Sequence, residues 1–338
     1  MNNSPIFLTG SDRSGTSLMF ALLASHPNIS MVRRTNMWRW FYKKYGDLGE
    51  RANFERCLTT LLRYQRLEHL KPDPERIRHE FWQGSPPTYG RLFALFHKHY
   101  AELNGRTRWG DKSLHTEHYA DQIFAEFPDA KMIHMIRDPR DRYASILKRY
   151  DDIDRGMAST TGRWLLSARM AKRNLKKYPE KYRVICYETL ARQPEEMLQQ
   201  VCDFIGEAYT PIMLSMQGAP EHQAGNSSFD KFEPGVISTR SIGRFRKVLS
   251  RQQISFIQTC ARRHLVAFNY RLDPIQLVTS EKLRFYLADL PINMVRLAGW
   301  SIMEKVTIRR GRSVPDHRLT DKQQPKNQTE TVANLSSG

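Results

Sequence analysis

Short apolar runs alternate with helix-forming segments along most of the chain. Residues 5–9 (Pro-Ile-Phe-Leu-Thr) have the length and character of a buried strand, and residues 15–25 continue as a helix. Two further strands are predicted over 131–136 and 182–187, each followed by a helix-forming run. Strands that alternate with helices predict an α/β fold in which helices flank a central parallel sheet.

Other segments interrupt or follow this pattern. Residues 37–103 carry apolar side chains at amphipathic spacing, broken by prolines, and predict a helical insertion that caps a site. Helices are expected over 250–268 and 281–306, after a Gly-, Ser-, Asn- and Pro-rich loop over 218–242. We therefore expect one main domain over 1–275, an amphipathic C-terminal helix within 276–310 and a disordered tail over 311–338.

The bulk composition narrows the class of protein. The 338 residues include 53 Lys and Arg against 35 Asp and Glu, a formal charge of +18, which suits nucleic acid, an anionic membrane surface or an anionic ligand. The four cysteines are widely spaced, so neither a zinc site nor a disulfide framework is indicated. We expect a cytoplasmic protein, soluble or peripheral at the inner face of a membrane, with 281–306 as the candidate membrane contact.

The loop over 10–17 (Gly-Ser-Asp-Arg-Ser-Gly-Thr-Ser) joins the first strand to the first helix. Such a loop exposes backbone N–H groups at a helix N-terminus, where anions bind. Its pattern is close to the nucleotide-triphosphate P-loop, but Thr16 stands where that loop needs lysine, and the basic residue is Arg13. The loop is suited to a phosphate group rather than to a nucleoside triphosphate with magnesium.

A second basic group follows the strand over 131–136. The sequence there is Arg-Asp-Pro-Arg-Asp over 137–141, with Ser145 further along the next helix. Arg137 and Ser145 can converge on a second phosphate outside the carboxyl ends of the strands. Arg137 also occupies the strand end where a magnesium-dependent phosphotransferase would carry an acid, which favours a nucleotide with an additional phosphate.

Several pieces of the chain together resemble the sulfotransferase family, whose members use 3′-phosphoadenosine 5′-phosphosulfate (PAPS). The pieces are the loop over 10–18, Gly-Asp-Lys-Ser over 110–113, residues 127–141 with Ser145, Tyr187-Glu188, and 241–246. The resemblance covers about 5–30 and 107–270 and is greater to the bacterial and tyrosylprotein-type branches. It implies a P-loop-NTPase-like sulfotransferase fold and sulfuryl transfer to a hydroxyl of a carbohydrate, a glycolipid or another small molecule.

The resemblance also implies roles for individual residues. The 5′-phosphosulfate would lie on Arg13, Ser14, Gly15, Thr16 and Ser17, and Lys112 would reach the transferring sulfuryl group. Arg137 and Ser145 would hold the 3′-phosphate, and Tyr187 would approach the adenine. A basic loop over 238–246, with Arg240 and Arg244, would close over the nucleotide. No metal is expected.

The catalytic base is where the chain departs from the family's pattern. The tyrosylprotein-type branch uses a Glu after the first helix, but the sequence over 31–36 has Arg33 and Arg34 there. The phenol-type branch uses a His two positions after the lysine, where this chain has Leu114 with His115 adjacent. We rank His115 ahead of Asp111, because an ordinary imidazole titrates near pH 6 to 7 and a carboxylate near 4.

Two other classes remain open at this point. A P-loop kinase would bind ATP with magnesium, and the absent lysine speaks against it. A basic nucleic-acid-binding module would bind any duplex with a steep salt dependence, and nothing besides charge favours it. Arg33 and Arg34, near two tryptophans, also suit an anionic or carbohydrate acceptor.

Overall fold

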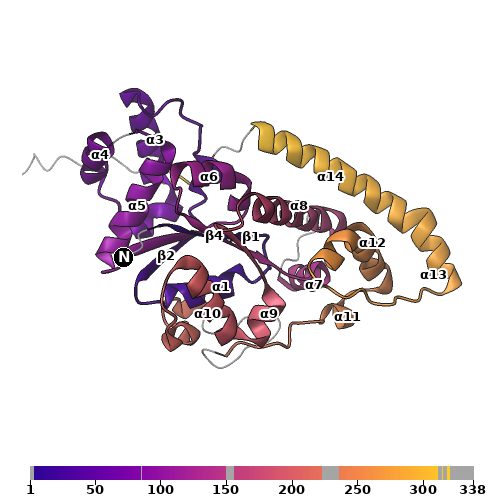
Figure 1. Cartoon of the computed structure of the whole chain (residues 1–338). Coiled ribbons are helices and arrows are strands. Elements are labelled where there is room, and N and C mark those ends of the chain that lie inside the picture. The colour runs from indigo at the N-terminus through magenta and orange to yellow at the C-terminus, as the bar shows by residue number, and fades with distance from the viewer. Residues whose placement is uncertain are drawn as a thin grey trace, which may run out of the picture.

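Five parallel strands form the central sheet of the computed structural model, which describes residues 4–84, 86–149, 156–222, 236–310, 314, 318 and 319 (Figure 1). The strand order is β2-β3-β1-β4-β5. The bounds are β1 Ile6–Gly10, β2 Ile29–Arg33, β3 Arg108–Lys112, β4 Lys131–Ile136 and β5 Tyr182–Cys186. The α/β fold with a parallel sheet is thus confirmed, and β1, β4 and β5 lie where the apolar runs predict them.

Strands β2 and β3 are not predicted from the sequence, and the prediction of three strands is corrected to five. Their sequences, Ile-Ser-Met-Val-Arg and Arg-Trp-Gly-Asp-Lys, contain no uninterrupted apolar run. The buried Arg108 is accommodated because it donates to the carbonyl oxygens of Ser4 at 2.6 Å and Ile205 at 2.7 Å and pairs with Glu207. These partners are distant in sequence, so only the tertiary fold reveals a buried strand.

The two faces of the sheet pack against different helices, as the alternation of side chains in a strand requires. Ile6 and Leu8 pack on the side of α1 (Thr16–Ala24), α9 (Tyr187–Arg192) and α10 (Pro194–Ile205). Phe7 packs on the opposite side, against the helical insertion and α6 (Ala120–Glu126). Figure 1 shows these two helical layers on either side of the strands.

The insertion after β2 is helical, as predicted. It consists of α2 Met37–Trp40, α3 Arg51–Arg63, a 3₁₀ helix η1 Gln65–Leu70, α4 Pro74–Gln83 and α5 Tyr89–Leu103. Asp73 and Thr88 cap α4 and α5 with their side-chain oxygens, which satisfies backbone N–H groups in the first turns.

The helices after β4 complete the molecule. Besides α9 and α10, they include α7 Pro139–Arg149, α8 Met157–Lys177, α11 Phe245–Val248, α12 Arg251–Ala267, α13 Thr279–Arg284, a π-helical turn η6 Phe285–Asp289 and α14 Leu290–Arg310. The predicted helix over 250–268 is confirmed and is capped by Ser250. A single helix is predicted over 281–306. The structure instead has α13, the π turn η6 and α14 in succession, which together run from Thr279 to Arg310.

Three further short 3₁₀ helices are described: η2 Thr116–Tyr119 between β3 and α6, and η4 Pro211–Ser215 and η5 Pro220–His222 after α10. Most of the predicted loop over 218–242 and of the predicted tail over 311–338 lies outside the described residues. Arg318 and Leu319 are described, and they lie against Trp40 and Tyr64 of the insertion. Among the described helices, none is both long and apolar enough to cross a bilayer.

Candidate active site

The loop between β1 and α1 has the conformation that its glycines predict. Gly10 and Gly15 have φ values of 137° and 88°, in the region that favours glycine. A side chain at Gly10 would lie 2.4 Å from the Met135 carbonyl oxygen, and one at Gly15 would lie 2.5 Å from the Tyr187 ring. Gly15 is the N-cap of α1 and offers no side-chain cap, so the first N–H groups of the helix face the loop.

Arg142 of α7 holds this loop in place. Its guanidinium donates to the Asp12 carbonyl oxygen at 2.7 Å and pairs with the Asp12 carboxylate. Burial acts to raise the pKa of Asp12, but Arg142, with His115 and Arg163, lowers the pKa overall. The Ser11 and Ser14 hydroxyls share a hydrogen bond of 2.8 Å. The loop is therefore fixed by residues of the protein itself, which leaves it preorganised for an anion.

The two predicted phosphate sites are brought side by side. Arg13 donates through Nε to the Ser145 hydroxyl at 3.0 Å, and Arg137 donates to the Arg13 carbonyl oxygen at 3.4 Å. Arg137 is only 5% exposed, and its Nε has no hydrogen-bond partner among the described residues. A buried guanidinium N–H without an acceptor is costly, so this site is suited to an anionic ligand.

Tyr187 and the loop over 238–246 lie beside Arg137. The Arg137 guanidinium stacks on the Tyr187 ring at 4.4 Å and donates to the Ser241 carbonyl oxygen at 3.0 Å. The Tyr187 and Ser241 hydroxyls are 2.7 Å apart. Asp141 accepts hydrogen bonds from the backbone N–H groups of Gly243 and Phe245, which fixes the loop against α7. The same loop carries Arg240 and Arg244. The Arg244 guanidinium donates to the Arg240 carbonyl oxygen.

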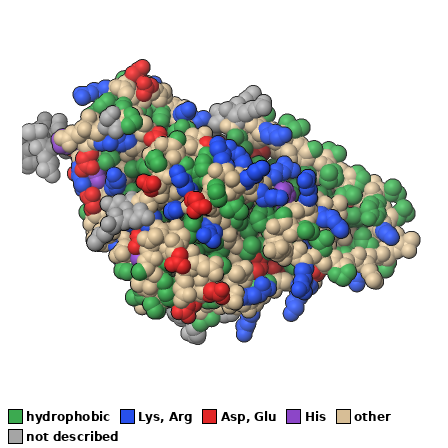
Figure 2. Space-filling model, in the orientation of Figure 1, with side chains coloured by type: hydrophobic (Ala, Val, Ile, Leu, Met, Phe, Trp, Pro, Cys, Tyr) green, Lys and Arg blue, Asp and Glu red, His purple; other side chains and the backbone are tan. Residues whose placement is uncertain are grey.

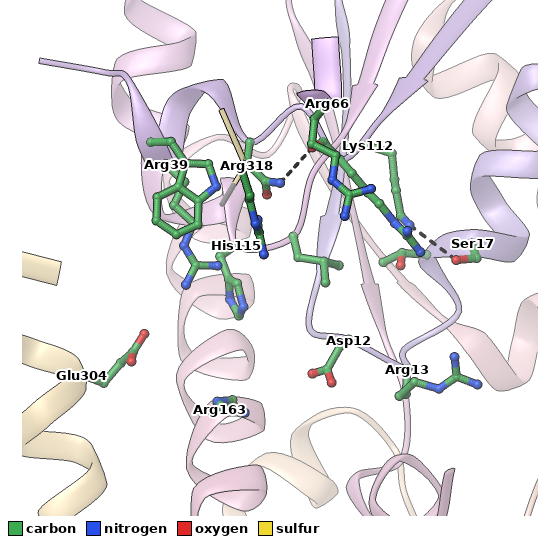
Figure 3. A pocket seen from close by; sticks show the side chains of 15 residues that line it. Asp12, Arg13, Ser17, Arg39, Arg66, Lys112, His115, Arg163, Glu304 and Arg318 are labelled. Atoms are coloured by element: carbon green, nitrogen blue, oxygen red, sulfur yellow. Dashed lines mark hydrogen bonds between the residues drawn. The ribbon is translucent and has the colours of Figure 1, made fainter. Parts of the chain in front are cut away.

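Lys112 ends β3 and points toward the start of α1. Its Nζ lies 3.4 Å from the Ser17 hydroxyl (Figure 3). Burial, together with the neighbouring Arg34 and Arg33, lowers the pKa of Lys112 to about 8. An anion bound between the loop and Lys112 would favour the charged ammonium.

A cavity of about 620 Å³ opens beside the loop, and Figure 3 shows the side chains that surround it. Six arginines and Lys112 line it, against two carboxylates: Arg13, Arg34, Arg39, Arg66, Arg163 and Arg318, with Asp12 and Glu304. The insertion contributes Arg39, Trp40 and Arg66, so it forms part of the cavity wall. Arg33 instead pairs with Glu221 at 3.1 Å and is not in the lining.

Only one of the two candidate bases lines this cavity. His115 does, and it adopts a positive φ of 68°. Asp111 is 2% exposed and accepts hydrogen bonds from the hydroxyls of Thr35 at 2.8 Å and Ser113 at 3.2 Å. Successive side chains of a strand point to opposite faces, which separates Asp111 from Lys112.

Their surroundings shift the pKa values of the two groups in opposite directions. Burial lowers the pKa of His115 to about 4, despite the opposing influence of Glu117. Burial raises the pKa of Asp111 above its ordinary value, although His97 and two hydroxyl groups favour its charged form. With its pKa lowered, His115 stays neutral and able to accept a proton at a lower pH than an ordinary imidazole would.

Several lining residues are not predicted from the sequence as site residues: Arg39, Arg66, Arg163, Glu304 and Arg318. They come from α2, η1, α8, α14 and the C-terminal segment, and no local motif marks them. For the four arginines among them, the only sequence signal is the excess of basic residues over the whole chain.

The fold is that of an α/β protein with a glycine-containing loop, suited to an anion, at the carboxyl edge of a parallel sheet. A model of the sulfotransferase family matches residues 5–211, and the chain belongs to that family. The predicted membership of the PAPS-dependent sulfotransferases is confirmed, and the protein is an enzyme of this class.

Solved structures agree in fold. The sulfotransferase domain from the Synechococcus PCC 7002 olefin synthase is 20% identical, with a TM-score of 0.55 over 80% of this chain and 97% of that one. The sulfotransferase domain from the curacin biosynthetic pathway is 18% identical, with a TM-score of 0.51 over 80% of this chain and 99% of that one. No curated protein matches this chain in sequence.

Proposed function

We propose that this enzyme transfers the sulfuryl group of PAPS to a hydroxyl of an acceptor bound in the cationic cavity. The S–O bond to the 5′-phosphate breaks, a new S–O bond to the acceptor oxygen forms, and the acceptor's proton passes to a base. The product nucleotide is 3′,5′-adenosine bisphosphate. The observation that carries the proposal is the pairing of the loop over 10–17 with Arg137, whose buried Nε has no partner among the described residues.

The residues divide into two groups by what they would contact. Arg13 and the residues Ser14 to Ser17 would bind the 5′-phosphosulfate, and Lys112 would stabilise charge on the sulfuryl oxygens in the transition state. Arg137 and Ser145 would bind the 3′-phosphate, with Tyr187, Arg240 and Arg244 around the nucleoside. No step in this scheme requires a metal.

The cavity lining supports an acceptor that is itself anionic. After Arg13 and Lys112 are assigned to PAPS, Arg34, Arg39, Arg66 and Arg163 still line the remaining space. Arginines bind carboxylates, phosphates and sulfates through paired N–H groups. We therefore favour a hydroxyl on a carbohydrate or glycolipid that already carries an acidic group. Paired acceptors that differ only in one anionic group test this selectivity in a transfer assay.

The two alternative classes, a P-loop kinase and a nucleic-acid-binding module, gain no support. Family membership favours sulfuryl transfer over phosphoryl transfer, and Thr16 still stands where a kinase loop needs lysine. The basic residues of the site surround a concave cavity, which suits a small anion better than a nucleic-acid duplex. The four free cysteines favour a reducing cytoplasm as the place of action.

Ligand-induced stabilisation tests the nucleotide assignment. Adenosine 3′,5′-bisphosphate without metal should raise the free energy of unfolding by about 2.7 kcal/mol at a hundred times its dissociation constant. Thermal unfolding measures this shift, with ATP plus magnesium and duplex DNA as comparison ligands. A shift with ATP and magnesium but not with the bisphosphate would contradict the assignment.

Replacing Arg137 with alanine should weaken binding of the bisphosphate by about 30-fold. The change removes a charge-assisted contact worth about 2 kcal/mol to the 3′-phosphate. Titration calorimetry measures the affinity, and Arg183→Ala on β5 is the matched control, because Arg183 is exposed and stacks on Phe204. Adenosine 5′-phosphate, which lacks the 3′-phosphate, should bind both proteins alike, and an equal loss with both nucleotides would refute the specific role.

A further inference from the structure

The C-terminal helices carry an apolar face that points away from the protein body. Within the described residues, Leu287 is 71% exposed, Val295 73% and Ile302 64%. We call this the outer face; its other large members are Leu283, Ile292, Met303 and Val306. Figure 2 shows hydrophobic side chains over the end of the molecule that α13 and α14 form. Isolated exposed apolar residues are ordinary, but a continuous face of this length marks an interaction surface.

The opposite side of α14 is attached to the body. Leu297 and Trp300 pack onto α8, where a side chain at Gly162 would lie 2.3 Å from the Trp300 ring. Glu304 lines the cationic cavity. α14 is therefore apolar on two sides, of which the described protein covers one. A helix that is apolar all round is normally buried all round, so the outer face has the character of a surface that something else covers.

The charged residues around the outer face are mainly basic. Lys282, Arg284, Arg296 and Lys305 are exposed along the same segment. The acidic residues are otherwise engaged: Asp289 lies 3.7 Å from Arg284, Glu281 caps α13, and Glu304 faces the cavity. An apolar stripe with exposed basic neighbours is complementary to a surface that offers both hydrocarbon and negative charge.

We propose that the outer face binds the surface of an anionic lipid bilayer, with α13 and α14 lying in the plane of the interface. Apolar side chains would enter the boundary between headgroups and acyl chains, and the basic residues would contact anionic headgroups. A second copy of the chain fits less well, because face-to-face pairing would bring together the basic residues of two molecules with a formal charge of +18 each. The proposal does not depend on the identity of the reaction.

Vesicle sedimentation with the full chain tests this surface. We expect binding to vesicles of phosphatidylcholine with about a third phosphatidylserine, and much weaker binding to phosphatidylcholine alone. The double variant V295E/I302E should reduce the partition coefficient on the anionic vesicles by at least about 30-fold, since it removes two exposed apolar side chains that would enter the bilayer and adds two negative charges. Leu103→Glu is the matched control, because Leu103 is 64% exposed at the end of α5.

A second variant, R296Q/K305Q, keeps the apolar face and tests the charge. It should weaken binding to anionic vesicles and leave the weak binding to phosphatidylcholine unchanged. Unchanged thermal unfolding and bisphosphate binding in both variants show that the fold is intact. Absence of binding to anionic vesicles, or equal binding by V295E/I302E, would overturn the proposal. So would a dimer in size-exclusion chromatography with light scattering that V295E/I302E converts to a monomer, which would assign the face to a second copy.

Discussion

Replacing Lys112 with alanine should lower kcat by about 10²- to 10³-fold and change the affinity for the bisphosphate product far less. Lys112 lies 3.4 Å from Ser17 at the start of α1, where the transferring group would lie between the loop and the ammonium. A preorganised cation at this point acts on charge that develops in the transition state, and loss of one such donor typically has this effect on rate. Steady-state kinetics with PAPS measures the change.

The matched control is Lys131→Ala. Lys131 begins β4 at the opposite edge of the sheet, where it donates to the Glu180 carbonyl oxygen. It should leave kcat within about twofold of the wild type, as surface changes away from a site usually do. A loss of bisphosphate affinity in Lys112→Ala as large as the loss of kcat would show that Lys112 binds the nucleotide rather than the transition state.

The proposed role of Lys112 also predicts how kcat/KM depends on pH. Burial and the neighbouring arginines lower the pKa of Lys112 to about 8, so the ammonium is charged well below that pH and loses its charge as the pH rises through it. The value of kcat/KM should therefore fall above about pH 8, tenfold per pH unit. In Lys112→Arg the limb should disappear, since a guanidinium stays charged throughout this range.

The parts of the fold that the sequence predicts are those whose signal is local. The runs that end at Gly10 and Ile136 are apolar because both faces of β1 and β4 are covered, so they stand out as buried strands. The loop over 10–17 stands out for a similar reason, because its glycines are required by the backbone itself. Such signals need no knowledge of the tertiary contacts.

The parts that the sequence does not predict depend on distant partners. Strand β3 has three charged residues in five, and it is buried only because Arg108 and Asp111 find partners in remote segments. The cavity arginines Arg66 and Arg163 come from an insertion and from a crossover helix, and each looks like an ordinary surface residue in its own segment. The cationic character of the cavity is a property of the assembled fold.

The catalytic base is the other point that local reasoning leaves open, and the structure gives its two candidates different expected results. His115→Gln should lower kcat by about 10²-fold, because His115 lines the cavity and can reach a bound acceptor. Asp111→Asn should leave kcat within a few-fold, because the carboxylate is held by Thr35 and Ser113 and does not line the cavity.

The free energy of unfolding should distinguish the same two variants, with the larger effect now in Asp111→Asn. Asp111→Asn disturbs buried hydrogen bonds, so it should lower the free energy of unfolding by about 1 to 3 kcal/mol. His115→Gln should leave stability nearly unchanged and spare bisphosphate binding. The exposed His79 provides the control variant, His79→Gln, which should alter neither quantity.

The acid limb of the pH profile then reports the base itself. An imidazole whose pKa is lowered to about 4 stays neutral, and able to accept a proton, down to that pH, so kcat in the wild type should not fall between pH 7 and 6. The limb should appear below about pH 5 and should be absent from the residual activity of His115→Gln. If His115→Gln retains full kcat and Asp111→Asn loses 10²-fold with its fold intact, the proton passes to Asp111 instead. A limb near pH 6 to 7 that His115→Gln abolishes would instead mean that water in the cavity restores His115 to its ordinary pKa.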